Sequence, residues 1–295
     1  MLLRTDLAIE AHKISGEITD GIDIYEKQNG TLRINRMNIR TEKASQKLQK
    51  PLGNYITIDG LPLTDNFRDI PAQVQAMSEE IRSLLPKKNG TVLVIGLGNV
   101  NITPDALGPK TASAVLATRH ITGELARSTG LDRLRSVAVL SPGVLGQTGI
   151  ETGELIISLI NRLEPSAVIA VDALASRSLA RLGCTVQISD SGISPGTGVG
   201  NNRLSLNKKT LGVSVIGIGI PTVVDASTLA AEFLGDSDSD LSKLKNTLSP
   251  RGEKMIVTPS EIDLLIERAS KLIGMAINCA LQSEFSFDEL ISLVS

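Results

Sequence analysis

The sequence predicts an α/β fold: a mostly parallel, twisted sheet with helices on both of its faces. Five apolar runs without alternation indicate strands that are buried on both sides, as in a parallel sheet. Helical patterns lie between these runs, and such strand–helix alternation is typical of α/β proteins. The five runs are TVLVIG (91–96), SVAVL (136–140), AVIAVD (167–172), TVQIS (185–189) and VSVIGIG (213–219).

Helices are predicted around these strands. The segment 72–85 is amphipathic and ends before Pro86, because proline cannot continue a helix. A long final helix is predicted over 258–282, with Thr258 and Glu261 as its capping box. Further helical patterns cover 106–119, 152–163, 174–181 and 225–233.

The first fifty residues differ from the rest in composition. They are polar and weakly patterned, with one strand indicated between Leu32 and Ile39. A short strand follows at 55–58. We therefore expect residues 1–50 to form an N-terminal appendage and residues 51–295 to form the α/β domain. The polar segment 235–254 is predicted to be a surface loop.

Composition excludes several functional classes. The 295 residues carry 30 basic and 32 acidic side chains, so no strong positive field exists for non-specific nucleic-acid binding. Two cysteines, Cys184 and Cys279, do not make a disulfide scaffold, which favours a reducing, cytosol-like compartment. The N-terminus lacks the apolar run of a signal peptide, and the longest apolar stretch, 211–224, is interrupted by glycines and Pro221. We expect a soluble protein.

Two aspartates stand where ligands bind in open parallel sheets, beyond the carboxyl ends of the strands. Asp105 follows Pro104 after the first predicted strand, and Asp172 directly follows the strand 167–171. Either side chain could instead only cap a helix. The pair Gly96 and Gly98 suggests a dinucleotide loop only weakly, because the third glycine of that motif is absent.

Two long glycine-rich loops follow other predicted strands. Residues 141–154 and 190–203 exceed the usual length of connections in α/β proteins. Such loops are either ordinary connections or present backbone amides to a peptide or an oxyanion. If they dock an extended substrate, the candidate residues are Gly143, Gly146, Gly149, Gly196 and Gly198.

The sequence lacks the residues that other common catalytic sites require. The chain has only two histidines, His12 and His120, and no GxSxG motif. The pair Asp105 and Asp172 remains, and two carboxylates with different pKa values can hydrolyse a bond through water. One alternative is a metal site formed by these two aspartates and His120. Another is a nucleotide-binding module without catalysis that uses the glycine loops.

Six motifs in series resemble one known family, the spore germination proteases. They are GLGN…TPDALGPK, TRH, SPGVLGQTGIET, VDALASRS, QISDSGISPGTGVGN and GIPTVVDA, within residues 4–282. The resemblance implies a self-processing zymogen of the aspartic endopeptidase type, with a fold similar to the hydrogenase maturation proteases. It implies that Asp105 and Asp172 are the catalytic pair. We expect no cofactor or metal, because the chain lacks the His and Cys density of a dedicated metal site. The resemblance further implies a homotetramer in the forespore or spore core that degrades small acid-soluble DNA-coating proteins and contacts neither nucleic acid nor membrane.

The N-terminus is similar to the self-processing site of this family. In the segment 4–10 an acidic residue, Asp6, is followed by the apolar Leu7 and by Ala8. The resemblance therefore implies a cut between Asp6 and Leu7. Because the terminus is polar and has little apolar content, we expect it to be unpinned and able to extend into an active site. Residues 1–50 would then contain the pro-segment, and residues 51–295 the protease domain.

Overall fold

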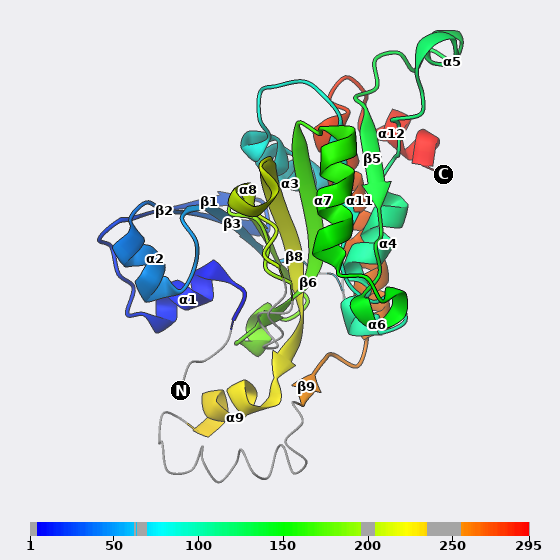
Figure 1. Ribbon diagram of the computed structural model, residues 1–295. Coiled ribbons are helices and arrows are strands. Elements are labelled where there is room, and N and C mark those ends of the chain that lie inside the picture. The colour runs from blue at the N-terminus through cyan, green and yellow to red at the C-terminus, as the bar shows by residue number, and fades with distance from the viewer. Residues whose placement is uncertain (1–4, 62, 64–69, 196–203, 235–254, 295) are drawn as a thin grey trace.

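The computed structural model describes residues 5–61, 63, 70–195, 204–234 and 255–294. Within this part of the chain, nine strands form one sheet in the order β1-β2-β3-β7-β8-β6-β4-β5, and β9 pairs with β8 (Figure 1). The strands are β1 Ile22–Asn29, β2 Leu32–Ile39, β3 Gly53–Asp59, β4 Val92–Gly96, β5 Val137–Leu140, β6 Ala167–Ser176, β7 Thr185–Ser189, β8 Ser214–Asp225 and β9 Ile256–Val257.

The sheet is mixed, so the prediction of a mostly parallel sheet is wrong. Three neighbouring pairs are parallel, namely β4–β5, β4–β6 and β6–β8. The five other pairs are antiparallel. The strand β7 is buried throughout and still runs antiparallel to both of its neighbours. Its sequence, TVQIS, alternates polar and apolar residues, a pattern typical of an antiparallel strand, and grouping it with the continuous apolar runs explains the error.

Helices cover both faces of the sheet, which confirms that part of the prediction. The largest core cluster joins α3 (Ile70–Leu84), α4 (Leu107–Ala114) and α11 (Ile262–Leu281) to one face. On the other face, α7 (Thr152–Leu163) and α8 (Lys208–Leu211) pack against β4, β6 and β8 (Figure 1). The chain is therefore α/β, with its parallel strands enclosed between two helical layers.

The N-terminal segment extends the same sheet. Strands β1 and β2 pair with each other, and β2 pairs with β3. Helices α1 (Ala8–Ile14) and α2 (Glu42–Leu48) pack on these strands in a small core of their own. The sequence indicated one strand here because most of β1 is exposed and carries no apolar alternation. The division of the chain at residue 50 stays a prediction.

Several predicted helix boundaries need correction. No helix spans 174–181, because β6 continues to Ser176 and a 3₁₀ turn, η2, covers Leu179–Arg181. The predicted helix 106–119 is only α4, preceded by the 3₁₀ turn η1 (Thr103–Asp105). The predicted capping box is absent, since α11 begins at Ile262 and the Thr258 hydroxyl donates to the Thr222 carbonyl.

The remaining α-helices of the described residues are α5 Gly123–Ser128, α6 Leu145–Thr148, α9 Ala226–Leu234 and α12 Phe287–Val294. The predicted helix 225–233 corresponds to α9. The predicted surface loop 235–254 lies outside the described residues. In the part of the chain that the structure describes, no helix combines the length and apolarity needed to cross a membrane.

Candidate active site

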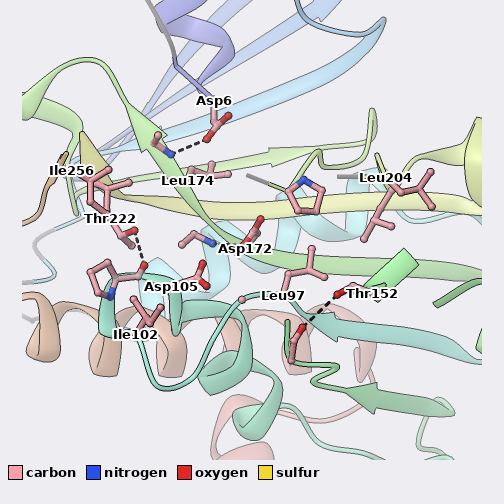
Figure 2. A pocket seen from close by; sticks show the side chains of 18 of the residues that line it. Asp6, Leu97, Ile102, Asp105, Thr152, Asp172, Leu174, Leu204, Thr222 and Ile256 are labelled. Carbon is pink, nitrogen blue, oxygen red and sulfur yellow. Dashed lines mark hydrogen bonds between the residues drawn. The ribbon is translucent and has the colours of Figure 1, made fainter. Parts of the chain in front are cut away.

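Asp105 and Asp172 line one cavity of about 350 Å³. Asp172 lies within β6, and Asp105 ends η1, which follows β4. Figure 2 shows both carboxylates directed into the space between these two elements. The sequence placed both residues at the carboxyl edge of the sheet, and the tertiary structure brings them to the same cavity.

The position of Asp172 follows from the burial of its strand. β6 is apolar on either side of this residue, and only 5% of Asp172 is exposed. Its Oδ1 accepts a hydrogen bond of 2.9 Å from the backbone N–H of Ala173. On the neighbouring strand β8 its register partner is Gly219. A Cβ at that glycine would stand 2.6 Å from the Asp172 carbonyl oxygen, so a larger residue would push the two strands apart there.

Asp105 is fixed by the backbone around it. Its Oδ2 accepts a hydrogen bond of 2.7 Å from the N–H of Asn99. The hydroxyl of Thr222 on β8 donates to the carbonyl of Pro104 at 2.7 Å (Figure 2). Gly98 has a φ of +114°, and a Cβ there would meet the Asp105 carbonyl oxygen at 2.1 Å. The turn that carries Asp105 is therefore held against both β4 and β8.

The glycine pair after β4 has a packing role. A Cβ at Gly96 would stand 2.1 Å from the carbonyl oxygen of Gly108 in α4. A Cβ at Gly108 would stand 2.2 Å from the Leu97 carbonyl oxygen. These glycines let α4 approach the strand closely and so place Asp105 beside β6. Close packing explains why glycine occupies positions 96 and 98, without a role for either residue in binding a dinucleotide.

The rest of the cavity wall is mainly apolar. Leu97, Leu174 and Val223 lie along it, and Ile102 and Ile256 stand at more exposed positions, 51% and 46% accessible. Residues from the loop after β5 and from the start of α7 complete one side, namely Gly143, Glu151, Thr152 and Gly153. The cavity can therefore receive an apolar side chain next to the two carboxylates, a setting that suits hydrolysis of a peptide bond beside such a residue.

Of the five predicted substrate-binding glycines, the structure describes three, and one of these three lines the cavity. Gly143 lines the cavity and has a φ of +72°. Gly146 lies within α6 and Gly149 caps that helix, and neither lines the cavity. Gly196 and Gly198 lie outside the described residues. The segment after β5 is thus partly helical.

Other nucleophiles and ligands lie elsewhere. His120 is exposed in a turn and does not line the cavity. Among the described residues, no group of three or more His, Cys, Asp or Glu side chains is arranged to hold a metal ion. Burial raises the pKa of the Cys184 thiol and of the Cys279 thiol, which keeps both in the less nucleophilic protonated form.

The N-terminal segment reaches this cavity. Asp6 is part of the cavity wall, and its N–H donates to the Ala175 carbonyl of β6 at 2.9 Å. Leu7 is fully buried in a cluster with Ile9 and Leu174. The expectation of an unpinned terminus is therefore wrong. A short apolar cluster and strand-like hydrogen bonds hold it, and neither produces a periodic pattern in the sequence.

Sequence analysis missed two parts of the site. Thr222 follows the buried run 213–219, and that position could have marked it as a residue at the active edge of the sheet. Ala175 gave no signal, since it contributes backbone groups only.

A family model described as germination protease matches residues 4–235. The chain belongs to the germination protease family. The germination protease of Caldanaerobacter subterraneus subsp. tengcongensis is 42% identical over 99% of this chain and 98% of that protein. That of Clostridium tetani is 38% identical over the full length of both, and that of a Geobacillus species is 33% identical over 97% and 95%.

Family membership confirms the resemblance seen in the sequence motifs. The chain is a peptidase of the germination protease family, and the matched region contains the N-terminal segment and both aspartates.

Proposed function

We propose that this chain is an aspartic-type endopeptidase in which Asp105 and Asp172 share one water molecule. One carboxylate takes a proton from the water as it attacks the peptide carbonyl, and the other protonates the leaving nitrogen or polarises the carbonyl. The observation that carries this proposal is that the two aspartates, from different elements, line the same largely apolar cavity. An apolar wall around the two carboxylates lowers the local dielectric constant and so strengthens their electrostatic interactions with a bound peptide.

We further propose the biological setting that the family suggests. The chain is made as a zymogen, forms a homotetramer in the spore core and degrades small acid-soluble DNA-coating proteins during germination. The apolar cavity suits the apolar residue that follows the cleaved bond in the proposed processing site, Asp6–Leu7. A nearly neutral formal charge of −2 suits an enzyme that removes protein from DNA without binding the DNA itself.

The test compares Asp105→Asn, Asp172→Asn and a matched control, Asp132→Asn, an exposed aspartate outside the cavity. We expect each active-site variant to lose about 10²- to 10⁴-fold in kcat/KM on an internally quenched peptide, with thermal unfolding unchanged. The control keeps its activity. Full activity in either folded active-site variant would rule out the proposed pair.

Self-processing is tested on the same proteins. The purified wild-type chain is incubated alone, and intact-mass spectrometry is expected to show loss of residues 1–6. The Asp172→Asn chain is expected to stay full length, because the cut needs the chain's own site. A mature terminus far from Leu7, or normal processing of purified Asp172→Asn, would contradict this assignment.

A further inference from the structure

The strand that carries Asp172 has an open backbone edge beside the cavity. β4 ends at Gly96, and the last hydrogen bond on that side runs from the Leu97 N–H to the Val171 carbonyl at 2.8 Å. Alternate residues of a strand direct their N–H and C=O groups to the same side. Ala173 and Ala175 therefore face the side where β4 has ended. The Ala173 N–H donates to the Asp172 carboxylate, which leaves the backbone groups of Ala175 to bind another segment.

Asp6 occupies this edge. Its N–H donates to the Ala175 carbonyl at 2.9 Å, and its Oδ2 accepts from the Ala175 N–H at 2.8 Å. One residue thus binds both backbone groups of Ala175, using a side-chain carboxylate where a neighbouring strand would offer a carbonyl. Figure 2 shows the hydrogen bond of the Asp6 carboxylate. A carboxylate makes a stronger acceptor than a carbonyl, so this contact selects an acidic residue.

Two side chains that line a second cavity donate hydrogen bonds to the backbone carbonyl of Asp6. Lys50 Nζ donates to it at 3.0 Å, and Gln187 Nε2 donates to it at 3.1 Å. Lys50 Nζ also donates to the Thr5 carbonyl at 2.9 Å. This second cavity, of about 730 Å³, is lined by Lys50 and Gln187, and Asp6 and Leu174 line both cavities. Asp6 therefore lies between the proposed catalytic aspartates and the partly buried ammonium group of Lys50.

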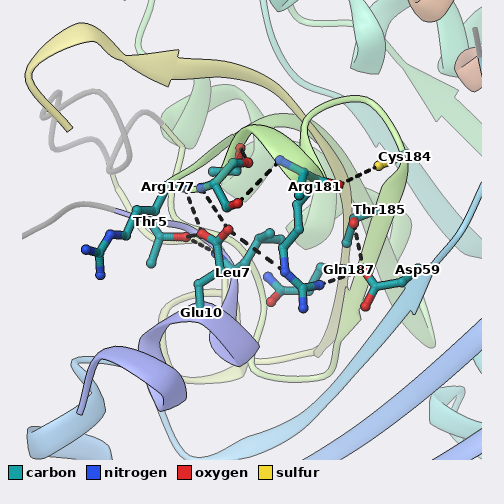
Figure 3. Close-up of polar contacts among 12 residues, drawn as sticks. Thr5, Leu7, Glu10, Asp59, Arg177, Arg181, Cys184, Thr185 and Gln187 are labelled. Carbon is teal, nitrogen blue, oxygen red and sulfur yellow. Dashed lines mark hydrogen bonds and ion pairs between the residues drawn. The ribbon is translucent and has the colours of Figure 1, made fainter. Parts of the chain in front are cut away.

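The residues after the proposed cut are anchored independently of Asp6. The Glu10 carboxylate accepts from the N–H groups of Arg177 and Ser178 at 2.8 and 3.1 Å (Figure 3). The N–H of Ala8 donates to the Gln187 Oε1 at 2.7 Å. Loss of residues 1–6 would leave these contacts in place and would empty the position of Asp6.

An emptied position would contain groups that need new partners. The Ala175 N–H and C=O, the Gln187 amide and the Lys50 ammonium would each lose a partner. Burial already lowers the pKa of Lys50, which shows how little solvent compensates its charge. Buried donors without acceptors are unfavourable, so this position favours a ligand that supplies a peptide N–H, a peptide carbonyl and a carboxylate.

We propose that Ala175, Lys50 and Gln187 form a binding subsite for an acidic residue of an extended peptide, which Asp6 fills in the uncut chain. This inference rests on the proposed self-processing at Asp6–Leu7 for its release step. It names the part of the enzyme that recognises the acidic residue before the cleaved bond. It also gives the uncut chain a way to exclude substrates, because its own residue already occupies the subsite.

The test uses the full-length chain with Asp6→Arg, which removes the carboxylate and places a second cation near Lys50. Binding of a fluorescently labelled peptide with the sequence of residues 1–6, MLLRTD, is measured by anisotropy. The same measurement with MLLRTN is expected to give about 10- to 100-fold weaker binding, because a charge-assisted hydrogen bond is lost. Adding Lys50→Met is expected to weaken MLLRTD to a similar degree, whereas Lys43→Met, on an exposed lysine, leaves its binding unchanged.

The outcomes separate this inference from the proposed function. Equal binding of the two peptides, or no effect of Lys50→Met in a chain whose thermal unfolding is intact, overturns the subsite whether or not the enzyme cuts peptides. Selective binding by the Asp6→Arg chain, together with processed wild-type enzyme that cleaves no peptide, supports the subsite and overturns the endopeptidase proposal. In processed wild-type enzyme, cleavage of Asp-Leu peptides is expected to exceed that of Asn-Leu peptides about tenfold or more, and Lys50→Met is expected to remove this preference.

Discussion

Replacing Gly108 by alanine tests how closely the two aspartates must be held. A Cβ at this position would lie 2.2 Å from the Leu97 carbonyl oxygen and 2.5 Å from the Val171 carbonyl oxygen. These atoms belong to the segment after β4 and to β6, which carry Asp105 and Asp172. An ordinary carbon–oxygen contact is at least about 3.3 Å, so α4 must move by roughly 1 Å. The two proposed catalytic groups would shift relative to each other.

The magnitude follows from the kind of atom that is displaced. Overpacking of a core typically costs about 1–3 kcal/mol. The obstructing atoms here are backbone atoms of buried segments, which cannot rotate away. We therefore expect Gly108→Ala to lower the free energy of unfolding by about 3 kcal/mol, and the melting temperature by about 6 °C. A displacement of this size beside the reacting atoms is expected to lower kcat/KM by about 10²-fold.

Thermal and urea unfolding measure the stability change, and a quenched peptide measures the activity. The stability control is Gly146→Ala within α6, where an added Cβ would meet nothing within 4 Å. We expect this control to be neutral or slightly stabilising, because alanine favours a helix over glycine. If Gly108→Ala unfolds within 1 kcal/mol of wild type and keeps full activity, close approach of α4 does not position the aspartates.

Three further predictions concern the metal question and the N-terminal contacts. EDTA should leave peptide cleavage unchanged, since the described residues form no metal-ligand cluster; loss of activity that one added metal restores would favour the metal-dependent alternative. Glu10→Gln should lower the free energy of unfolding by about 2–3 kcal/mol in urea denaturation, because it removes charge-assisted hydrogen bonds from Arg177 and Ser178. The control Glu284→Gln, at an exposed position, should leave the free energy of unfolding unchanged. Equal effects of the two substitutions would show that the Glu10 contacts contribute little to stability. Burial lowers the pKa of Lys50, so the unfolded chain keeps this proton to a higher pH than the folded chain does. The contribution of Lys50 to the free energy of unfolding should therefore rise as pH increases from the lowered pKa towards the ordinary value of about 10.4. Lys50→Met should flatten this alkaline slope in pH-dependent unfolding, and an unchanged slope would contradict the assignment.

The sequence by itself determined the fold class and the positions of the aspartates along the chain. Continuous apolar runs located β4, β6 and β8, because burial on both faces favours apolar residues in a strand, and the shorter runs 136–140 and 185–189 located β5 and β7. A polar residue that interrupts or follows such a run stands out, and this identified Asp172. The motif series identified the family, because several short motifs in a fixed order are far more specific than any one of them.

Only the tertiary structure decided the strand directions and the neighbours of Asp6. Burial determines which residues are apolar, but direction depends on how the chain connects, and the eight residues between β6 and β7 are too few for a parallel crossover. The contacts of Asp6 join residues that are separated by 44 positions for Lys50 and 169 for Ala175. A lysine in a polar segment and an alanine in a strand carry no local signal of these contacts, since backbone groups and long-range pairs exist only once the sheet has formed.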